Sequence, residues 1–258
     1  MHTRASAQVR DLPGAAGPER RSVVAVAGAV VASLVPTACA EGYVAKLKKK
    51  VPYYRTMTGD RAPMYEPLAR QMVQEYGLDD GIAVEIGGSA GAFSISLAQK
   101  TQMTVYNVDL DPWAMRLCGV LVDEAGLTGR VIPLEGDALD MPLRDNFADF
   151  IFSRAVIPFV PDKVQFMREV YRVLKPGGVA YVGHGGFGTL LDPAIRARLV
   201  NQRLRRWAEG NVPEGWEGPA EGMVGLAHEA GVDTCRLITE PDVGWWLEMR
   251  KPAVGSQQ

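Results

Sequence analysis

Short apolar segments alternate with amphipathic segments along the C-terminal two thirds of the chain. The apolar segments predict strands at 82–86, 104–109, 130–134, 148–153, 178–184, 233–239 and 243–250. Apolar residues at helical spacing predict helices near 91–99, 112–126, 161–174 and 192–208. Alternation of this kind is typical of a parallel sheet that carries helices on both faces. We therefore predict an α/β fold with a Rossmann-like, doubly wound, seven-stranded, mostly parallel sheet and an antiparallel C-terminal hairpin.

Residues 41–80 precede the first predicted strand and form a helical, amphipathic extension in this interpretation. Three prolines are expected to interrupt it: Pro52, Pro63 and Pro67. A helical extension at this place can cover a ligand site as a lid, so we place Tyr53 and Tyr54 on the substrate side. Packing of these rings on the sheet is the alternative.

Residues 1–40 differ in composition from the rest of the chain. The first 21 residues are rich in Ala, Gly, Pro and Arg without any period, which predicts disorder. Residues 22–40 carry no charge and follow a pair of arginines. The twin arginine and a closing Ala-x-Ala sequence fit a secretory signal, whereas the length fits one membrane-spanning helix. A soluble helix or a misplaced start codon is the third interpretation.

Composition and charge narrow the choice of function. The chain has 258 residues, 47% of them hydrophobic, which indicates a soluble α/β protein with a sizeable core. Residues 1–56 hold nine Lys/Arg against three Asp/Glu, so they carry +6 of a net charge of −2 and the remainder carries −8. This balance argues against a nucleic-acid partner. The cysteines lack metal-ligand spacing, so we expect neither a metal site nor a disulfide: Cys39, Cys118 and Cys235.

A glycine-rich turn follows the first predicted strand. Residues 82–91 read Ile-Ala-Val-Glu-Ile-Gly-Gly-Ser-Ala-Gly, and helical spacing begins directly afterwards. Small residues let backbone N–H groups approach a ligand, and a helix N-terminus favours electronegative atoms. The turn therefore predicts a ligand site, with an ordinary strand-to-helix turn as the alternative.

Polar residues stand at the carboxyl ends of four successive predicted strands: Glu85, Asp109, Asp137 and the pair Ser153-Arg154. In an open parallel sheet these ends meet in the crevice where ligands bind. An acid after the second strand accepts hydrogen bonds from ribose hydroxyls. An acid after the third strand can accept one from an exocyclic amine such as adenine N6. The strand ends therefore predict an adenosine-containing ligand.

The ordered set of motifs resembles the class I S-adenosylmethionine-dependent methyltransferases over about residues 70–252. The first motif has the spacing Glu-x-Gly-Gly-x-x-Gly, whereas nicotinamide enzymes show Gly-x-Gly-x-x-Gly. Residues 105–112 are similar to the family's ribose-acid motif, and residues 136–143 and 172–178 are similar to later motifs. Ser89 stands where the family's middle glycine usually lies, and we expect the adjacent glycine to preserve the turn.

The resemblance implies S-adenosylmethionine as cofactor and methyl transfer to a small-molecule acceptor. It places Glu85 near the methionine amino group and Asp109 on the ribose. It places Asp137 and Ala138 on the adenine, and Ser153 beside the sulfonium. The other cofactor-binding residues that it implies are Ile86, Gly87, Gly88, Ser89, Gly91 and Leu110.

His184, at the end of the fifth predicted strand, is the candidate general base because its ordinary pKa suits neutral pH. A structural histidine in a glycine loop is the alternative. Arg154 is a substrate-side candidate that could hold an anion or pair with a nearby acid. Residues 153–156 read Ser-Arg-Ala-Val and lack the Asn/Asp-Pro-Pro-aromatic motif of enzymes that methylate amino groups of DNA bases or glutamine. A non-catalytic S-adenosylmethionine-binding or scaffold protein and an NAD-dependent oxidoreductase are the rival functions.

The domain boundaries follow from these assignments. Residues 81–252 form the expected methyltransferase domain, with a substrate-side insertion at 185–228. S-adenosylmethionine is made in the cytoplasm, so we expect a cytoplasmic enzyme, associated with a membrane if residues 22–40 insert. Export with a cleaved leader would separate the enzyme from its cofactor. The oligomeric state cannot be predicted.

Overall fold

The computed structural model describes residues 37–51, 54, 58–210, 220–240 and 244–255. Their seven strands form one sheet in the order β3-β2-β1-β4-β5-β7-β6. The strands are β1 (Ile82–Ile86), β2 (Thr104–Asp109), β3 (Val131–Glu135), β4 (Ala148–Ser153), β5 (Leu174–His184), β6 (Cys235–Glu240) and β7 (Gly244–Arg250). Strand β7 pairs antiparallel with β5 and β6, and the other pairings are parallel. The predicted sheet with its C-terminal hairpin is confirmed.

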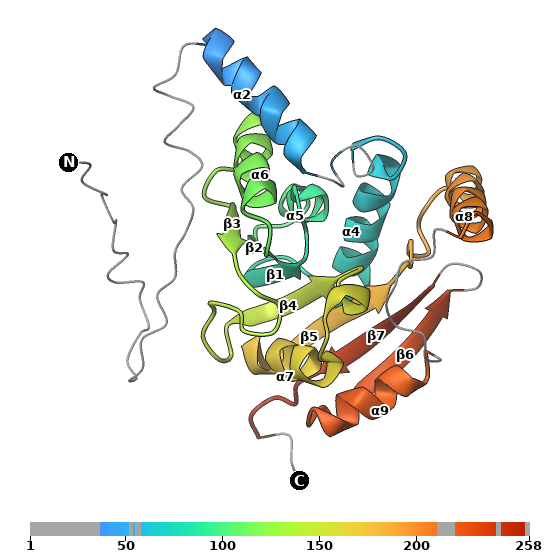
Figure 1. The fold of residues 1–258 in the computed structure, drawn as a ribbon. Helices are drawn as coiled ribbons and strands as arrows, with labels where there is room; N and C mark the ends of the chain where they lie inside the picture. Colours follow the sequence, from blue (N-terminus) through green and yellow to red (C-terminus); the bar gives the residue numbers. More distant parts are fainter. Residues whose placement is uncertain (1–36, 52–53, 55–57, 211–219, 241–243, 256–258) are drawn as a thin grey trace.

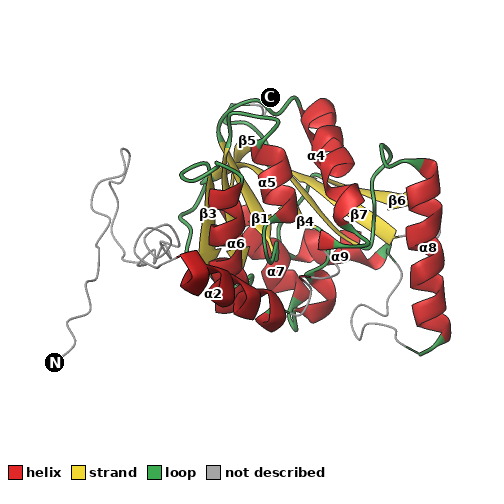
Figure 2. Ribbon diagram, turned by 90° about the horizontal axis from the view of Figure 1, so that it is seen from above, coloured by secondary structure: helices red, strands yellow, loops and turns green. Residues whose placement is uncertain are grey.

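Helices cover both faces of this sheet (Figures 1 and 2). The helices are α2 (Thr37–Lys50), α4 (Ala62–Tyr76), α5 (Ala92–Ala98), α6 (Pro112–Glu124), α7 (Lys163–Val173), α8 (Pro193–Ala208) and α9 (Gly222–Glu229), with the 3-10 turn η1 (Ile157–Phe159). One core cluster joins α2, α4, α5 and α6 to the sheet, and a second joins α7 and α9 to its opposite face. Strand β1 serves both clusters because successive side chains of a strand point to opposite faces.

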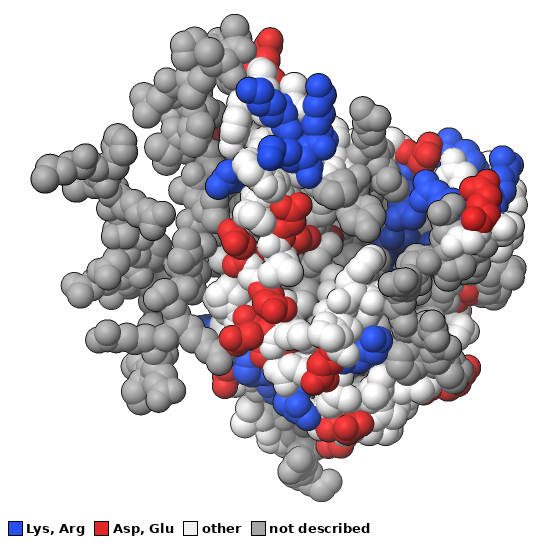
Figure 3. Space-filling view, in the orientation of Figure 1, with Lys and Arg blue, Asp and Glu red and all other residues white. Residues whose placement is uncertain are grey.

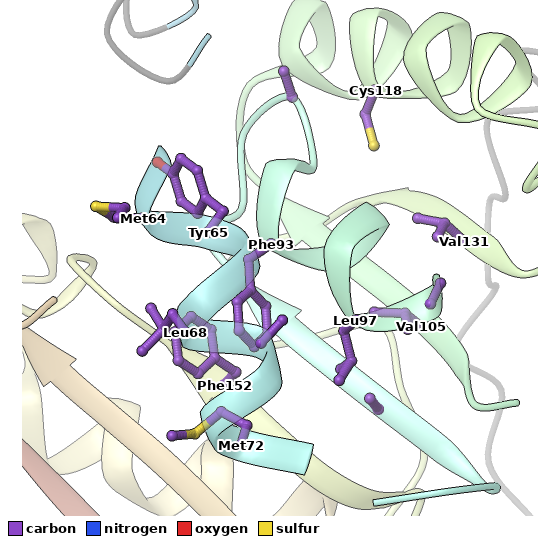
Figure 4. Packing of buried hydrophobic residues seen from close by; sticks show 14 of the residues in the cluster. Met64, Tyr65, Leu68, Met72, Phe93, Leu97, Val105, Cys118, Val131 and Phe152 are labelled. Atoms are coloured by element: carbon purple, nitrogen blue, oxygen red, sulfur yellow. The ribbon is translucent and has the colours of Figure 1, made fainter. Parts of the chain in front are cut away.

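The core beneath α4 and α5 is built around aromatic packing. Phe93 of α5 stacks on Phe152 of β4 with ring centroids 3.7 Å apart, and both side chains are buried. Figure 4 shows Leu68 and Met72 of α4 beside these two rings. Each such side chain contributes about 1.5–3 kcal/mol when it leaves water. This packing fixes α4 and α5 on the sheet, and the N-terminal end of α4 borders the cavity at the strand ends.

Two features of the helices differ from the sequence-based expectation. Helix α4 continues through Pro63 and Pro67. Pro63 lies in the first turn, where N–H groups have no intrahelical partner, and Pro67 removes only one later hydrogen bond. Helix α9 was not predicted, and its buried Met223 and Ala227 pack in the core that it shares with α7. Pro52 lies outside the described residues.

The described part of the N-terminal region begins with helix α2. Residues 1–36, which include most of the segment interpreted as signal or anchor, lie outside the described residues. Helix α2 packs on α6, with Leu47 buried and the Lys50 ammonium 4.1 Å from the centre of the Trp113 ring. Among the described helices, none has both the length and the apolar character needed to cross a membrane.

Candidate active site

A cavity of about 920 Å³ lies at the carboxyl ends of the parallel strands. It lies where the strand order reverses between β1 and β4, which is where open α/β sheets bind ligands. Many of the predicted site residues line this cavity: Glu85, Ile86, Gly87, Gly88, Ser89, Asp109, Leu110, Asp137, Ala138, Arg154 and His184. The structure therefore brings residues from five strand ends together around one space.

The glycine loop after β1 packs too closely for larger residues. At Gly87, φ is +71° and an added Cβ would overlap the Val156 side chain. At Gly88, an added Cβ would overlap the Asn107 amide oxygen and lie 2.5 Å from the carboxyl carbon of Glu85. Glycine here lets the main chain run directly over two polar side chains while it borders the cavity.

Ser89 occupies the place of the family's middle glycine and adopts a left-handed conformation with φ of 48°. Its N–H donates to Asp109 Oδ2 at 2.8 Å, and its carbonyl accepts a hydrogen bond from Asn107 Nδ2 at 2.9 Å. The left-handed region costs a residue with a side chain about 1–2 kcal/mol. The two hydrogen bonds offset that cost, so serine keeps the backbone course that a glycine would give.

Glu85 is buried beneath the loop. Its Oε2 accepts hydrogen bonds from the Ser94 N–H at 2.9 Å and from Ser94 Oγ at 2.5 Å. Burial raises the pKa of Glu85 to about 7, the two bonds from Ser94 oppose this rise, and the charge of Asp109 adds to it. Burial therefore favours the neutral carboxyl group, and a cation beside it would favour the charged form.

Acceptor oxygens line the side of the cavity formed by β2 and β3. Asp109 accepts the N–H groups of Ser89 and Asp111, and burial raises its pKa. Asp137 accepts the Leu139 N–H at 2.9 Å through one carboxylate oxygen. A carboxylate has about four acceptor positions, so both acids keep acceptors for hydroxyl or amine groups of a ligand.

The side formed by β4 and β5 is basic. Arg154 donates from Nε to the Gly186 carbonyl at 2.8 Å and from a terminal nitrogen to the Gly185 carbonyl at 3.1 Å. His184 ends β5, and its Nδ1 is buried without a hydrogen-bond partner among the described residues. Burial and the charges of Arg203 and Arg154 lower the pKa of His184 to about 4, so the imidazole is neutral at pH 7.

Three predicted residues do not line the cavity. Ser153 is buried and donates from Oγ to the Ile86 carbonyl at 3.1 Å, which ties the ends of β4 and β1 together. Gly91 caps helix α5 with φ of 82°, and Tyr54 packs against the core on the α4 side of the sheet. Tyr53 lies outside the described residues.

Other cavity residues were not among the predicted site residues, chiefly Arg61, Tyr65, Phe187, Leu199, Arg203 and Arg206. The helix that carries Arg203 and Arg206 has a run of arginines, which in a sequence is most often a solvated helix face and does not single out these two residues. No sequence pattern singled out Arg61, which reaches the cavity because α4 packs on the sheet. The expected substrate-side insertion at 185–228 contains both α8 and α9. Helix α8 contributes residues to the cavity, whereas α9 packs on α7 and β6.

A sheet of this order, with a glycine loop after β1 and acids after β2 and β3, defines a domain that binds a nucleoside-containing cofactor. A family model described as a methyltransferase domain matches residues 84–182. A solved structure from Methanococcus maripaludis, described as an S-adenosylmethionine-dependent methyltransferase, has a TM-score of 0.69 and 26% identity. The match covers 83% of this chain and 95% of that one. Residues 84–182 thus form a methyltransferase domain, and the chain has the fold of the class I S-adenosylmethionine-dependent methyltransferases.

Two sequence relatives extend this comparison. An uncharacterized protein of Mycobacterium tuberculosis is 30% identical over 189 residues, which cover 67% of this chain and 66% of that protein. The erythromycin 3''-O-methyltransferase of Saccharopolyspora erythraea is 26% identical over 192 residues, 70% of this chain and 62% of that enzyme. The chain thus spans slightly less than two thirds of the length of these relatives.

Proposed function

We propose that the protein transfers a methyl group from S-adenosylmethionine to a small-molecule acceptor. The observation that carries this proposal is the glycine loop over Glu85, closed by the bond from Ser89 to Asp109. Relatives named as small-molecule methyltransferases, such as the Saccharopolyspora enzyme, support the choice of acceptor class.

The lining residues suit the proposed cofactor. Gly87 and Gly88 border the cavity, and the absence of side chains there lets the loop pack directly on Val156, Asn107 and Glu85. Asp109 and Asp137 offer acceptors for ribose hydroxyls and the adenine amine, and Glu85 offers a negative charge for the methionine ammonium. Leu110, which is 68% exposed, offers an apolar surface beside these acids.

When bound, S-adenosylmethionine supplies a methyl carbon whose bond to sulfur breaks as the acceptor's electron pair attacks, so that neutral S-adenosylhomocysteine leaves. The protein's part is to align the acceptor and to exclude water. Val156 and Phe187 give the cavity apolar walls for this purpose. His184 is our candidate for the base that takes the proton that the acceptor loses, because its imidazole is neutral and its Nδ1 has no hydrogen-bond partner among the described residues.

A binding protein without turnover is the second candidate, because the pKa of about 4 makes His184 a weak base in the ligand-free cavity. The full-length protein would be incubated with methyl-labelled S-adenosylmethionine and pools of small alcohols, amines and carboxylic acids. Catalysis predicts S-adenosylhomocysteine together with a labelled product that has gained one CH₂. Tight cofactor binding without any labelled product in all pools would favour the second candidate.

A further inference from the structure

Glu85 and Asn107 lie side by side beneath the glycine loop. They pair in register on the adjacent parallel strands β1 and β2, so their side chains point to the same face of the sheet. Both side chains are buried. A Cβ on Gly88 would overlap Asn107 Oδ1 and lie 2.6 Å from Glu85 Oε2, so the two oxygens face the same small space. Two acceptor groups therefore meet under the loop.

The amide nitrogen of Asn107 fixes the direction of its oxygen. Nδ2 donates to the Ser89 carbonyl at 2.9 Å and to Cys118 Sγ at 3.2 Å. An amide turned by 180° would place Oδ1 against the Ser89 carbonyl oxygen, so Oδ1 is the atom beside Glu85. Oδ1 is buried and has no hydrogen-bond donor among the described residues. A buried acceptor of this kind requires a donor.

A proton on Glu85 supplies that donor. The charged carboxylate can only accept hydrogen bonds, and it sets a negative charge against the negative end of the Asn107 amide dipole. The O–H of the neutral carboxyl group can instead donate to Oδ1. Ser94 acts in the opposite direction, because its N–H and its hydroxyl both donate to Glu85 Oε2 and so favour the charged form.

Other ionisable groups face Glu85 from the elements packed around it. Asp109 on β2 adds a negative charge, which also favours the neutral carboxyl group. Burial raises the pKa of Cys118 on α6 to about 12 and that of Tyr65 on α4 above its usual value, so both are neutral at pH 7. In Figure 3 the basic side chains over α2 and α8 form separate blue areas, and red acidic side chains lie near both, so this face applies no field of a single sign. The contacts with Asn107 and Ser94 therefore decide the protonation of Glu85.

We propose that Asn107 is a positioning residue of the cofactor site: it accepts the proton of neutral Glu85 in the empty cavity, and the methionine ammonium group of the cofactor displaces that proton. Glu85 lines the cavity, so the ammonium group can reach it. The O–H bond of Glu85 breaks, the proton passes to the solvent, and the ammonium group keeps its own protons. This inference rests on the proposed function, and it adds a pH dependence of cofactor binding.

Calorimetric titration of the full-length protein with S-adenosylhomocysteine at pH 6 and pH 8 tests this inference. Each titration is repeated in two buffers that differ in ionisation enthalpy, which counts the protons released. Burial raises the pKa of Glu85 to about 7, so the wild type should release close to one proton at pH 6 and far less at pH 8. The affinity should be about tenfold higher at pH 8 than at pH 6.

Two variants remove opposite partners of the carboxyl group. Asn107→Leu removes the oxygen that favours the neutral form, so the proton release at pH 6 and the affinity difference between the two pH values should both become smaller. Ser94→Ala removes a hydroxyl that favours the charged form, so the proton release at pH 8 and the affinity difference should both become larger. Loss of packing alone would not shift the two variants in opposite directions.

The outcomes separate the role of Asn107 from the proposed function. Binding of S-adenosylhomocysteine without proton release at pH 6 in the wild type overturns this inference alone. Wild-type proton release and pH dependence in Asn107→Leu also overturn it. If Asn107→Leu does not fold, Asn107→Ala removes the same oxygen without added bulk and carries the same expectation. Failure of S-adenosylhomocysteine to bind at either pH overturns the proposed function and this inference with it.

Discussion

Replacement of Gly88 by alanine tests the close packing beneath the glycine loop. The added Cβ would lie 2.5 Å from Glu85 Cδ and 2.6 Å from Oε2, and it would overlap the Asn107 amide oxygen. Glu85 is held by Ser94, and Asn107 is held by its bond to Ser89. Neither group is the free end of a flexible side chain, so both must shift. Overpacking of this kind costs about 1–3 kcal/mol.

The Gly88→Ala variant should therefore fold with a free energy of unfolding lower by about 1–3 kcal/mol, which corresponds to a fall in Tm of about 2–12 °C. Displacement of Glu85 should also weaken S-adenosylhomocysteine about tenfold. Thermal unfolding and calorimetric titration measure the two effects. The matched control is Gly225→Ala in α9, where an added Cβ has no atom within 4 Å. The control should equal the wild type or gain up to about 1 kcal/mol. Wild-type stability and affinity in Gly88→Ala would refute this reasoning.

Two further predictions concern buried carboxylates. Because the folded state raises the pKa of Glu85 from 4.5 to about 7, it binds that proton more tightly than the unfolded state does. The free energy of unfolding should thus fall by up to about 3 kcal/mol as the pH rises from 4.5 to 7, and urea unfolding of the Glu85→Gln variant should not show this fall. Stability that changes with pH in the same way in the wild type and the variant would contradict this prediction. Glu240→Gln removes the charge that pairs with Arg196, so urea unfolding should show a free energy of unfolding lower by about 3 kcal/mol. The affinity for S-adenosylhomocysteine should be retained. A loss below about 1 kcal/mol would contradict the buried pairing.

The sheet and its acid-lined side could be predicted because their signals are local. Each strand is a short apolar run, and β1 ends at Ile86 directly before the glycine loop. Asp109 ends β2 and Asp137 comes two residues after β3, so each acid stands at a predicted strand end. Parallel strands bring their carboxyl ends to one edge of the sheet. Pattern and topology together therefore place these acids without knowledge of side-chain packing.

The basic side of the cavity depends on contacts between distant elements. Arg61 comes from the start of α4 and Arg203 from α8, and their meeting depends on how each helix packs on the sheet. The same limit applies to Ser153, whose position at a strand end predicted a ligand contact. Its side chain instead turns toward the Ile86 carbonyl. Sequence periodicity identifies a buried or exposed face and does not determine which buried partner a hydroxyl finds.

The cofactor site is tested most directly by calorimetric titration of the full-length protein with S-adenosylmethionine, S-adenosylhomocysteine and NAD. Asp109→Ala removes the carboxylate that holds the Ser89 N–H, and Asp123→Ala removes an acid on α6 that does not line the cavity. We predict micromolar binding of the first two ligands, weaker binding of NAD, and loss of binding in Asp109→Ala alone. No binding of S-adenosylmethionine to the wild type, or unchanged binding in Asp109→Ala, would contradict it.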